Sequence, residues 1–306
     1  MTSFVLTLIA AVPGELTARP LANATTALTA AGATVAEPVW LADGWAADLP
    51  FTGAAPADVI GAVRIALAGA QIDAIAQAAA GRRKRLLVAD MDSTIIAQES
   101  LDEMADLLGL KDKIAAITAK AMNGQLDFAA AVRERVGLLA GLDRSAIAKT
   151  LDRLTIQPGA HCLVATMRAH GAHCVLATGG FGDFAAPIAE RCGFDVVQAN
   201  TLHWDGDKLV GTVGEPILGK DAKATRLHQE AAQLGCSAAD AVAIGDGAND
   251  LAMLAIAGLG LAVHAKPVVA LEAPHRIETG TLHAVLFAQG YATRDFSSLP
   301  EDGVPT

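Results

Sequence analysis

The chain has 306 residues, of which 52% are hydrophobic, and a formal net charge of −10. That hydrophobicity excludes bulk disorder, and the acidic balance without a long basic run disfavours nucleic acid and anionic membranes as partners. The four cysteines form no CxxC pair, which fits a reducing compartment. The apolar N-terminus lacks a positively charged leader region, so we expect no signal peptide and a cytoplasmic protein.

The first 83 residues predict a small α+β module, with its boundary at Gly81–Lys84. Hydrophobic periodicity separates its elements. In chain order we expect a strand at 4–12, a helix at 16–31 ended by Gly32, a strand at 34–40, mostly loop from 43 to 56, a helix at 59–70, and an ambiguous segment at 71–77.

Beyond residue 84 the pattern changes to strands that alternate with helices, which predicts a doubly wound parallel sheet of the Rossmann-like α/β class over residues 84–290. The predicted strands are Leu86–Ala89, Cys174–Ala177 and Ala241–Ile244. A long helical region, about 98–157, interrupts the first crossover and predicts an inserted helical cap. Its expected breaks are near Gly109, Gly124 and Gly141. Residues 291–306 contain Pro, Asp and Ser and are expected to form a disordered tail.

Two aspartates follow the first predicted core strand. Asp90 and Asp92 are two positions apart, a spacing that places strand side chains on the same side. The C-terminal end of a buried parallel strand is where open α/β sheets bind ligands. Two close carboxylates repel each other, and a hard cation such as Mg²⁺ would relieve that repulsion through oxygen ligands. The alternative interpretation is an acidic loop that caps the next segment.

Three further segments carry residues that could act with Asp90 and Asp92 on a phosphate group. Thr178-Gly179-Gly180 offers a hydroxyl and unhindered backbone N–H groups that suit a phosphate. Lys223, early in a predicted helix, offers a point charge. Asp246 and Asp250 share one face if the chain becomes helical after Gly247. One carboxylate can attack phosphorus, and another can protonate the leaving oxygen and later deprotonate water.

These four segments, with Phe181 and Gly245-Asp246-Gly247-Ala248-Asn249-Asp250, resemble the four motifs of the haloacid dehalogenase (HAD) superfamily over about residues 85–285. More closely, they resemble its phosphoserine phosphatases. The resemblance implies that Asp90 is the nucleophile and Asp92 the general acid/base. It also implies that Mg²⁺ is held by Asp90, the Asp92 backbone carbonyl and Asp246, with Asp250 supporting the metal from outside its ligand set.

The same resemblance assigns the substrate contacts. Thr178, Gly179 and Lys223 would hold the phosphate, and Asn249 would contact the substrate. In the inserted cap, Glu99 would meet the substrate amine, and Arg135, in Val132-Arg133-Glu134-Arg135-Val136, would pair with its carboxylate. Pocket-lining cap residues would be Met122 and Phe128. The sequence departs at Thr178, where those phosphatases usually carry serine; threonine keeps the hydroxyl on a stiffer side chain.

The implied reaction is hydrolysis of O-phosphoserine to serine and phosphate through an aspartyl-phosphate, in serine biosynthesis. The N-terminal module resembles the amino-acid-binding ACT-like regulatory domain that precedes some of these enzymes, and a structural or dimerising module is an equal alternative. We therefore expect a small-molecule substrate, no nucleic acid and no membrane partner, and leave open a homodimer through this module. An amino-acid sensor with an inert second domain is disfavoured by the intact set of charged motif residues.

Two other motifs compete for a catalytic role. His161-Cys162 through Arg168 matches the HC-x5-R pattern of cysteine phosphatases, but its intervening residues contain no glycine and suit a helix packed on a sheet, so we expect a buried structural cysteine. Gly214 through Asp221 nearly matches a phosphate-binding Walker loop. Asp221 replaces the required hydroxyl residue, and Pro216 removes a needed N–H.

Overall fold

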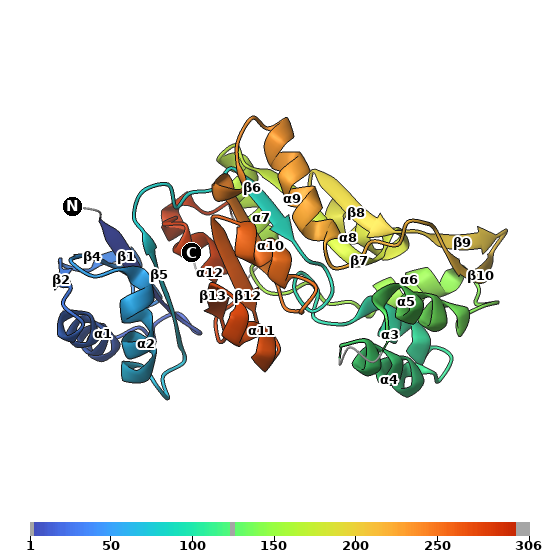
Figure 1. Ribbon diagram of the computed structural model, residues 1–306, viewed down its shortest axis with the longest axis horizontal. Coiled ribbons are helices and arrows are strands. Elements are labelled where there is room, and N and C mark those ends of the chain that lie inside the picture. Colours follow the sequence, from blue (N-terminus) through green and yellow to red (C-terminus); the bar gives the residue numbers. More distant parts are fainter. Residues whose placement is uncertain (1–2, 123–125, 298–306) are drawn as a thin grey trace.

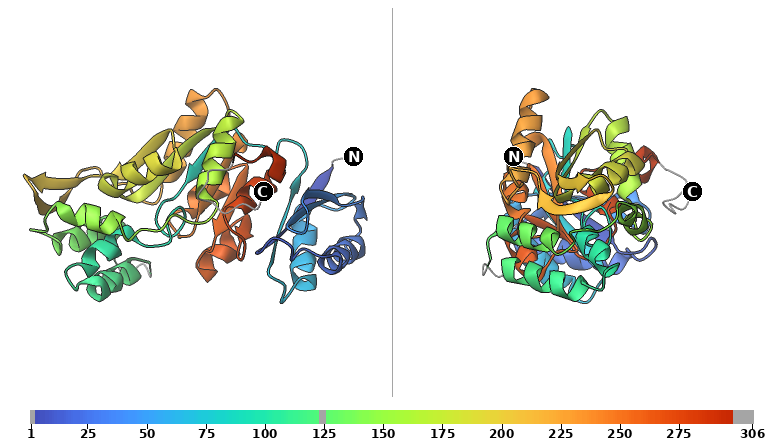
Figure 2. Two further views of the ribbon diagram at one scale, coloured as in Figure 1. Left: turned by 180° about the vertical axis from the view of Figure 1, so that it is seen from behind. Right: turned by 90° about the vertical axis from the view of Figure 1, so that its right-hand side faces the viewer.

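The computed structural model describes residues 3–122 and 126–297. An N-terminal module (residues 4–78) lies at one end, a parallel sheet with its helices forms the centre, and a helical segment with a β-hairpin lies at the other end (Figure 1). The view from behind shows the same order of the three parts (Figure 2). The central sheet therefore lies between the N-terminal module and the helical segment (Figure 1).

The N-terminal module contains an antiparallel sheet in the order β2-β4-β1-β5, with β3 also paired to β4. Two helices pack against this sheet, because Leu21, Leu28, Val59 and Val63 are buried in the same core as the strands. The elements are β1 (Phe4–Ala10), α1 (Ala18–Ala30), β2 (Thr34–Val35), β3 (Val39–Ala42), β4 (Ala46–Thr52), α2 (Pro56–Ala66) and β5 (Ile72–Ala78).

Two expectations for this module were wrong. The stretch 43–56, expected to be mostly loop, contains β4, and the single strand expected at 34–40 is two short strands, β2 and β3, on either side of Pro38. Gly44 and Gly53 are turn residues with positive φ, but they flank the strand instead of interrupting it. Pro50 lies within β4 opposite Val5. Burial of Ala46 through Leu49 therefore outweighs the local breaker signals.

The central sheet has six strands in the order β13-β12-β11-β6-β7-β8, and all adjacent pairs are parallel. This confirms the parallel α/β sheet. The strands are β6 (Leu86–Ala89), β7 (His173–Phe181), β8 (Val196–Asn200), β11 (Ala241–Gly245), β12 (Leu259–Val263) and β13 (His275–Ile277).

Helices cover both faces of this sheet, as doubly wound folds require. Along β6, Leu87 and Ala89 belong to one buried cluster, and Leu86 and Val88 belong to the other. The first face carries α7 (Ala160–Ala169), α8 (Gly182–Cys192) and α12 (His283–Ala288), and the second carries α9 (Ala222–Gln233), α10 (Leu251–Ile256) and α11 (Pro267–Glu272). Cys162 is fully buried inside α7, so the residues of the HC-x5-R pattern form a helix.

Between β6 and α7, the described residues form four helices: α3 (Ser100–Asp106), α4 (Lys111–Met122), α5 (Phe128–Gly137) and α6 (Ser145–Leu151). Breaks expected near Gly109 and Gly141 fall between helices, and Gly124 lies outside the described residues. The hairpin of β9 (Leu202–Asp205) and β10 (Lys208–Val213) contacts this segment, since Gly141 N donates to Leu209 O at 2.7 Å.

Two details differ from the sequence-based expectations. The strand expected at Cys174–Ala177 extends to Phe181, so Thr178, Gly179 and Gly180 continue β7 and do not form a loop after it. Tyr291 was expected in a disordered tail but is buried, with the Arg83 guanidinium 4.3 Å above its ring. Residues 298–306 of that tail lie outside the described residues.

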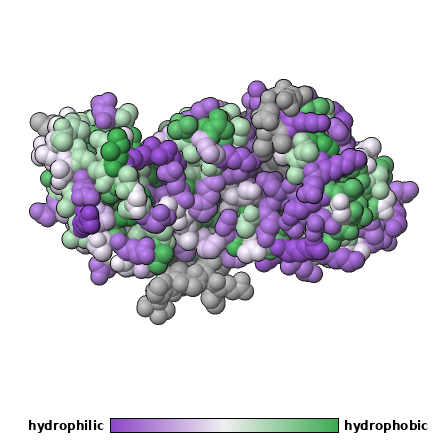
Figure 3. All heavy atoms as spheres, turned by 90° about the horizontal axis from the view of Figure 1, so that it is seen from below, coloured by the Kyte–Doolittle hydropathy of each residue, from purple (hydrophilic) through white to green (hydrophobic). Residues whose placement is uncertain are grey.

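None of the helices within residues 3–122 and 126–297 combines the length and apolar character needed to cross a membrane. Viewed from below, polar and apolar residues are interspersed over the surface of the molecule (Figure 3).

Candidate active site

The carboxyl ends of β6, β7 and β11 meet at one edge of the central sheet. The register places Ala89 opposite both Leu176 and Ile244, so the residues that come just after these three positions lie side by side. Asp90 continues from β6, and its backbone N–H donates to Ile244 O at 3.0 Å. Asp90 is only 5% exposed, and its Oδ1 accepts a hydrogen bond from Met91 N at 2.7 Å. Sheet pairing therefore fixes the backbone that carries this carboxylate.

The Asp92 carboxylate lies beside the start of α3. Its Oδ1 accepts from Ser100 N at 2.7 Å, and its Oδ2 accepts from the Thr178 hydroxyl at 3.4 Å. Burial, and next the negative charge of Glu99, raise the pKa of Asp92 to about 6, although the Ser100 hydrogen bonds oppose this. A carboxyl group with a pKa near the working pH can both release and accept a proton.

Lys223 joins two of the carboxylates. It is the second residue of α9, and its Nζ lies 2.7 Å from Asp90 Oδ1 and 2.6 Å from Asp250 Oδ1. All three side chains are buried. Burial lowers the pKa of Lys223, but the two carboxylates outweigh it and raise the pKa above its usual value. Lys223 is therefore a permanent positive charge at the sheet edge.

Asp246 and Asp250 follow β11. Asp250 precedes α10 and accepts from Gly247 N at 3.0 Å, which closes the turn. A Cβ atom on Gly245 would lie 2.3 Å from Asp250 Cγ, so glycine is required there. Carboxylate oxygens of Asp90, Asp246 and Asp250 lie within 4.8 Å of one another. Burial, and next Asp250, raise the pKa of Asp246 to about 7.

The end of β7 presents a hydroxyl and backbone groups to these acids. Gly180 N donates to the Thr178 hydroxyl at 2.8 Å, and Asn200 Nδ2 donates to Gly179 O at 2.8 Å. A Cβ atom on Gly180 would lie 2.8 Å from Asp92 Oδ2. The small residues therefore allow Asp92 to approach the strand closely.

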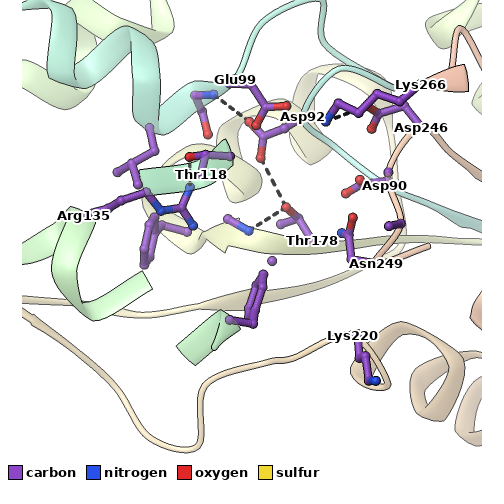
Figure 4. A pocket seen from close by; sticks show the side chains of 18 residues that line it. Asp90, Asp92, Glu99, Thr118, Arg135, Thr178, Lys220, Asp246, Asn249 and Lys266 are labelled. Carbon is purple, nitrogen blue, oxygen red and sulfur yellow. Dashed lines mark hydrogen bonds and ion pairs between the residues drawn. The ribbon is translucent and has the colours of Figure 1, made fainter. Parts of the chain in front are cut away.

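A cavity of about 280 Å³ opens between this sheet edge and the helical segment. In Figure 4, Asp90, Asp246 and Asn249 lie on one side and Arg135 on the other, with Asp92 and Thr178 between them. Its volume is at the small end of ligand pockets, which suits a small metabolite. The cavity thus combines an acidic end, a Thr-Gly-Gly strand end and a cationic end.

Glu99, directly before α3, and Arg135, in α5, add two more charged side chains to the cavity wall. Glu99 Oε1 accepts from the Ser93 hydroxyl at 3.0 Å, and Ser93 has a positive φ of 56°. Arg135 Nη1 donates to the Thr118 hydroxyl at 3.2 Å. Burial lowers the pKa of Arg135, and Asp102, Glu99 and Asp92 oppose that shift.

The structure brings most of the predicted site residues to this one cavity. Its wall includes Asp90, Asp92, Glu99, Phe128, Arg135, Thr178, Gly179, Asp246 and Asn249, while Lys223 and Asp250 lie directly behind Asp90. Met122 is the last residue of α4, and its side chain lies outside the described residues.

Four polar residues of the wall were missed by sequence reasoning: Ser100, Thr118, Lys220 and Lys266. Lys266 was detectable, because it lies shortly after the end of β12, and its Nζ lies 4.0 Å from Asp246 Oδ2. Thr118 carries no comparable signal, since its place depends on how α4 packs over the sheet, and Lys220 lies in the loop before α9.

The chain belongs to the haloacid dehalogenase-like hydrolase family, whose model matches residues 87–255. A probable phosphoserine phosphatase of Schizosaccharomyces pombe is 38% identical over 230 residues, which cover 74% of this chain and 77% of that protein. A phosphoserine phosphatase of Streptomyces coelicolor is 40% identical over 229 residues, or 75% of this chain, but the match spans only 56% of that relative's length.

Solved structures that resemble this chain point to the same family. An HAD family hydrolase from Salmonella enterica has a TM-score of 0.81 and 28% identity, and the match covers 93% of this chain and 98% of that one. A phosphoserine phosphatase determined as a phospho-aspartyl intermediate analogue has a TM-score of 0.63 and 35% identity over 67% of this chain and 98% of that one. The chain is therefore a hydrolase of the HAD family.

The raised pKa of Asp246 predicts how metal-free stability depends on pH. Because the folded-state pKa of about 7 exceeds the usual 3.8, wild-type stability falls as pH rises between these values. In EDTA at pH 8, Asp246→Asn should therefore unfold with a free energy about 2 to 4 kcal/mol higher than wild type, since one pKa unit corresponds to about 1.4 kcal/mol. The gain should vanish near pH 4, as followed by denaturant unfolding.

The exposed Asp112 provides the matched control, and Asp112→Asn should leave the free energy of unfolding within about 0.5 kcal/mol of wild type. An Asp246→Asn variant less stable than wild type at pH 8 in EDTA would contradict the electrostatic interpretation.

Proposed function

We propose that this protein is a Mg²⁺-dependent phosphatase of O-phosphoserine that acts through an aspartyl-phosphate. The observation that carries the proposal is the single cavity in which Asp90, Asp92 and Thr178 face Glu99 and Arg135. The first three suit phosphoryl transfer, and the last two suit the ammonium and carboxylate groups of an amino acid. The names of the relatives support the same substrate.

In this mechanism Asp90 attacks phosphorus through a carboxylate oxygen, and the bond between phosphorus and the seryl oxygen breaks. Burial and Asp250 raise the pKa of Asp90, while Lys223 opposes that shift. The Lys223 ammonium, 2.7 Å from Asp90, therefore helps to keep the nucleophile ionised. Because it also contacts Asp250, its position is fixed before substrate binds.

Asp92 transfers the protons. With a pKa near 6, its carboxyl group can protonate the departing seryl oxygen and then, as a carboxylate, remove a proton from the water that hydrolyses the aspartyl-phosphate. The hydrogen bond from Ser100 N holds one carboxylate oxygen, which leaves Oδ2 beside Thr178 to face the reacting group.

The acidic cluster fits a divalent cation, because three buried carboxylates converge and the pKa of Asp246 is raised in their company. Asp90, Asp246 and the Asp92 backbone carbonyl would hold Mg²⁺. Asp250, engaged by Lys223 and Gly247 N, would support that set without ligating the metal. When bound, Mg²⁺ neutralises negative charge on the transferring phosphoryl group.

The remaining residues orient the substrate. Thr178, Gly179 and Lys223 would bind the phosphate, and Asn249 would contact the substrate beside it. Glu99 would bind the ammonium and Arg135 the carboxylate, with Phe128 lining the pocket beside them. Helices α3–α6 would act as a cap, within the interval of about 98–157, that excludes water until the aspartyl-phosphate has formed.

The proposal extends to the biological setting, in which the reaction is the step of cytoplasmic serine biosynthesis that releases serine. For the N-terminal module we propose an ACT-like regulatory role. Its antiparallel sheet with two helices against it is compatible with that assignment. A homodimer through this module is the form in which such a role would be exerted.

Phosphate release from O-phosphoserine tests the proposed reaction directly. Wild type with Mg²⁺ should release phosphate, and EDTA should abolish the release. Asp90→Asn removes the nucleophile, so kcat should fall at least about 1,000-fold while circular dichroism stays native. Alkylation of thiols should leave activity largely intact, because the cysteines have no part in the reaction. Near-normal turnover by Asp90→Asn would refute the proposal.

Arg135→Ala tests the carboxylate contact, and Arg133→Ala is the matched control two residues away. Arg133 points to Glu215 outside the cavity, with Nη2 2.6 Å from Oε1. We expect Arg135→Ala to lower kcat/KM for phosphoserine about 10- to 100-fold, through loss of a charge-assisted hydrogen bond, and to reduce the preference over phosphoethanolamine, which lacks the carboxylate. Equal effects of the two variants would count against this role.

A further inference from the structure

One carboxylate far from the cavity is buried where the N-terminal module meets the central sheet. Asp73 lies in β5, is 3% exposed, and β5 packs beside β13, the edge strand of the central sheet. Its hydrogen bonds reach across the boundary, because the donors are backbone N–H groups of residues 278–280, the loop that follows β13. A charge of the N-terminal module therefore holds a loop of the central sheet.

The geometry of this contact leaves the loop little freedom. Asp73 Oδ1 accepts from Glu278 N at 2.7 Å, and Oδ2 accepts from Gly280 N at 2.7 Å; Thr279 N contacts both oxygens at 3.2 and 3.3 Å. A Cβ atom on Gly280 would lie 3.0 Å from Asp73 Oδ2. Charge-assisted hydrogen bonds to three successive N–H groups fix both the position and the orientation of the loop.

The same loop contacts the next strand end. Gly280 O accepts from His264 Nε2 at 2.8 Å, and His264 N donates to Ile277 O at 2.9 Å. His264 directly follows β12 and has a positive φ of 46°, a backbone conformation that residues other than glycine rarely adopt without stabilising contacts. The hydrogen bonds with Gly280 and Ile277 supply those contacts.

Two residues further on, the chain reaches the active site. Lys266 N donates to Asp246 O at 3.4 Å, and Lys266 Nζ lies 4.0 Å from Asp246 Oδ2 at the cavity wall. Hydrogen bonds therefore connect Asp73 through Gly280 to His264, and the two chain residues that follow His264 lead to the contacts of Lys266 with Asp246. They cross the adjacent ends of β13, β12 and β11.

Two other contacts of the N-terminal module end elsewhere. Gln77 Nε2 donates to Ala288 O at 2.7 Å, and the Trp45 ring packs edge-on against Phe287, with ring centroids 5.0 Å apart. Both partners belong to α12, on a face of the sheet and not at the strand ends. These contacts attach the module without leading to the cavity, so they offer a control for docking alone.

We infer that Asp73 is a positioning residue. Through it, the N-terminal module determines the position of the loop that carries Lys266, and thereby the position of the Asp246 side of the active site. The inference rests on the proposed function only in treating Asp246 as a metal ligand. Through this contact the N-terminal module affects the active-site edge of the central sheet, and the effect requires no ligand bound to the module.

Asp73→Asn is the first test, in the full-length protein, with Gln77→Ala as the docking control. Asparagine keeps the shape but replaces one acceptor oxygen with a donor that faces N–H groups. We expect amide hydrogen exchange in residues 264–266 and 278–280 to rise about 3- to 30-fold, and the Mn²⁺ concentration for half-saturation, followed by electron paramagnetic resonance without substrate, to rise by a similar factor. Gln77→Ala should change neither.

His264→Asn cuts the path inside the central sheet while the N-terminal module stays attached, and asparagine tolerates the left-handed backbone. If the path runs through His264, adding Asp73→Asn to His264→Asn should raise the Mn²⁺ half-saturation by less than twofold. Unchanged exchange at 264–266 in Asp73→Asn, equal effects of Gln77→Ala, or fully additive effects in the double variant would overturn the inference. Failure of phosphoserine hydrolysis in wild type would refute the proposed function alone, because exchange and Mn²⁺ binding are read without substrate.

Discussion

The site depends on the buried contact of the Lys223 ammonium with Asp90 and Asp250. Isolated buried charges cost several kcal/mol each, so none of the three would remain ionised alone. Together they place one cation between two anions, with distances of 2.7 and 2.6 Å. The arrangement ties the end of β6 to the start of α9 and to the turn before α10. It therefore fixes Asp90, Lys223 and the Asp246 loop relative to one another.

The carboxylates around this contact carry more negative charge than Lys223 can balance. Lys223 offsets only part of the charge of Asp90, Asp246 and Asp250, and the raised pKa of Asp246 reflects the remainder. In the proposed mechanism, a divalent cation would supply the missing positive charge. Asp92 lies apart from this cluster, beside Glu99 and Ser100, and its pKa is raised to about 6. Two aspartates separated by one methionine are thus placed in different surroundings, which is the basis for the different roles that we propose for them.

Much of this arrangement could be predicted from the sequence, because strand ends are local signals. Asp90, Thr178 and Asp246 each follow a short apolar run, and parallel pairing brings such ends together. Strand β4 could not be predicted, since Pro50 and its flanking glycines resemble a loop until burial is known. The path from Asp73 to Lys266 was equally hidden, because it joins residues about 200 positions apart through backbone groups that carry no side-chain signature.

The central claim is that Asp90 becomes phosphorylated, and the most direct measurement is to locate the phosphoryl group during turnover. Enzyme mixed with Mg²⁺ and radiolabelled O-phosphoserine, quenched in acid within milliseconds and digested, should carry label on the peptide that contains Asp90. The label should be sensitive to hydroxylamine and absent from Asp90→Asn. Label on another residue, or serine formation by the intact enzyme with phosphate transferred directly to water, would contradict the account.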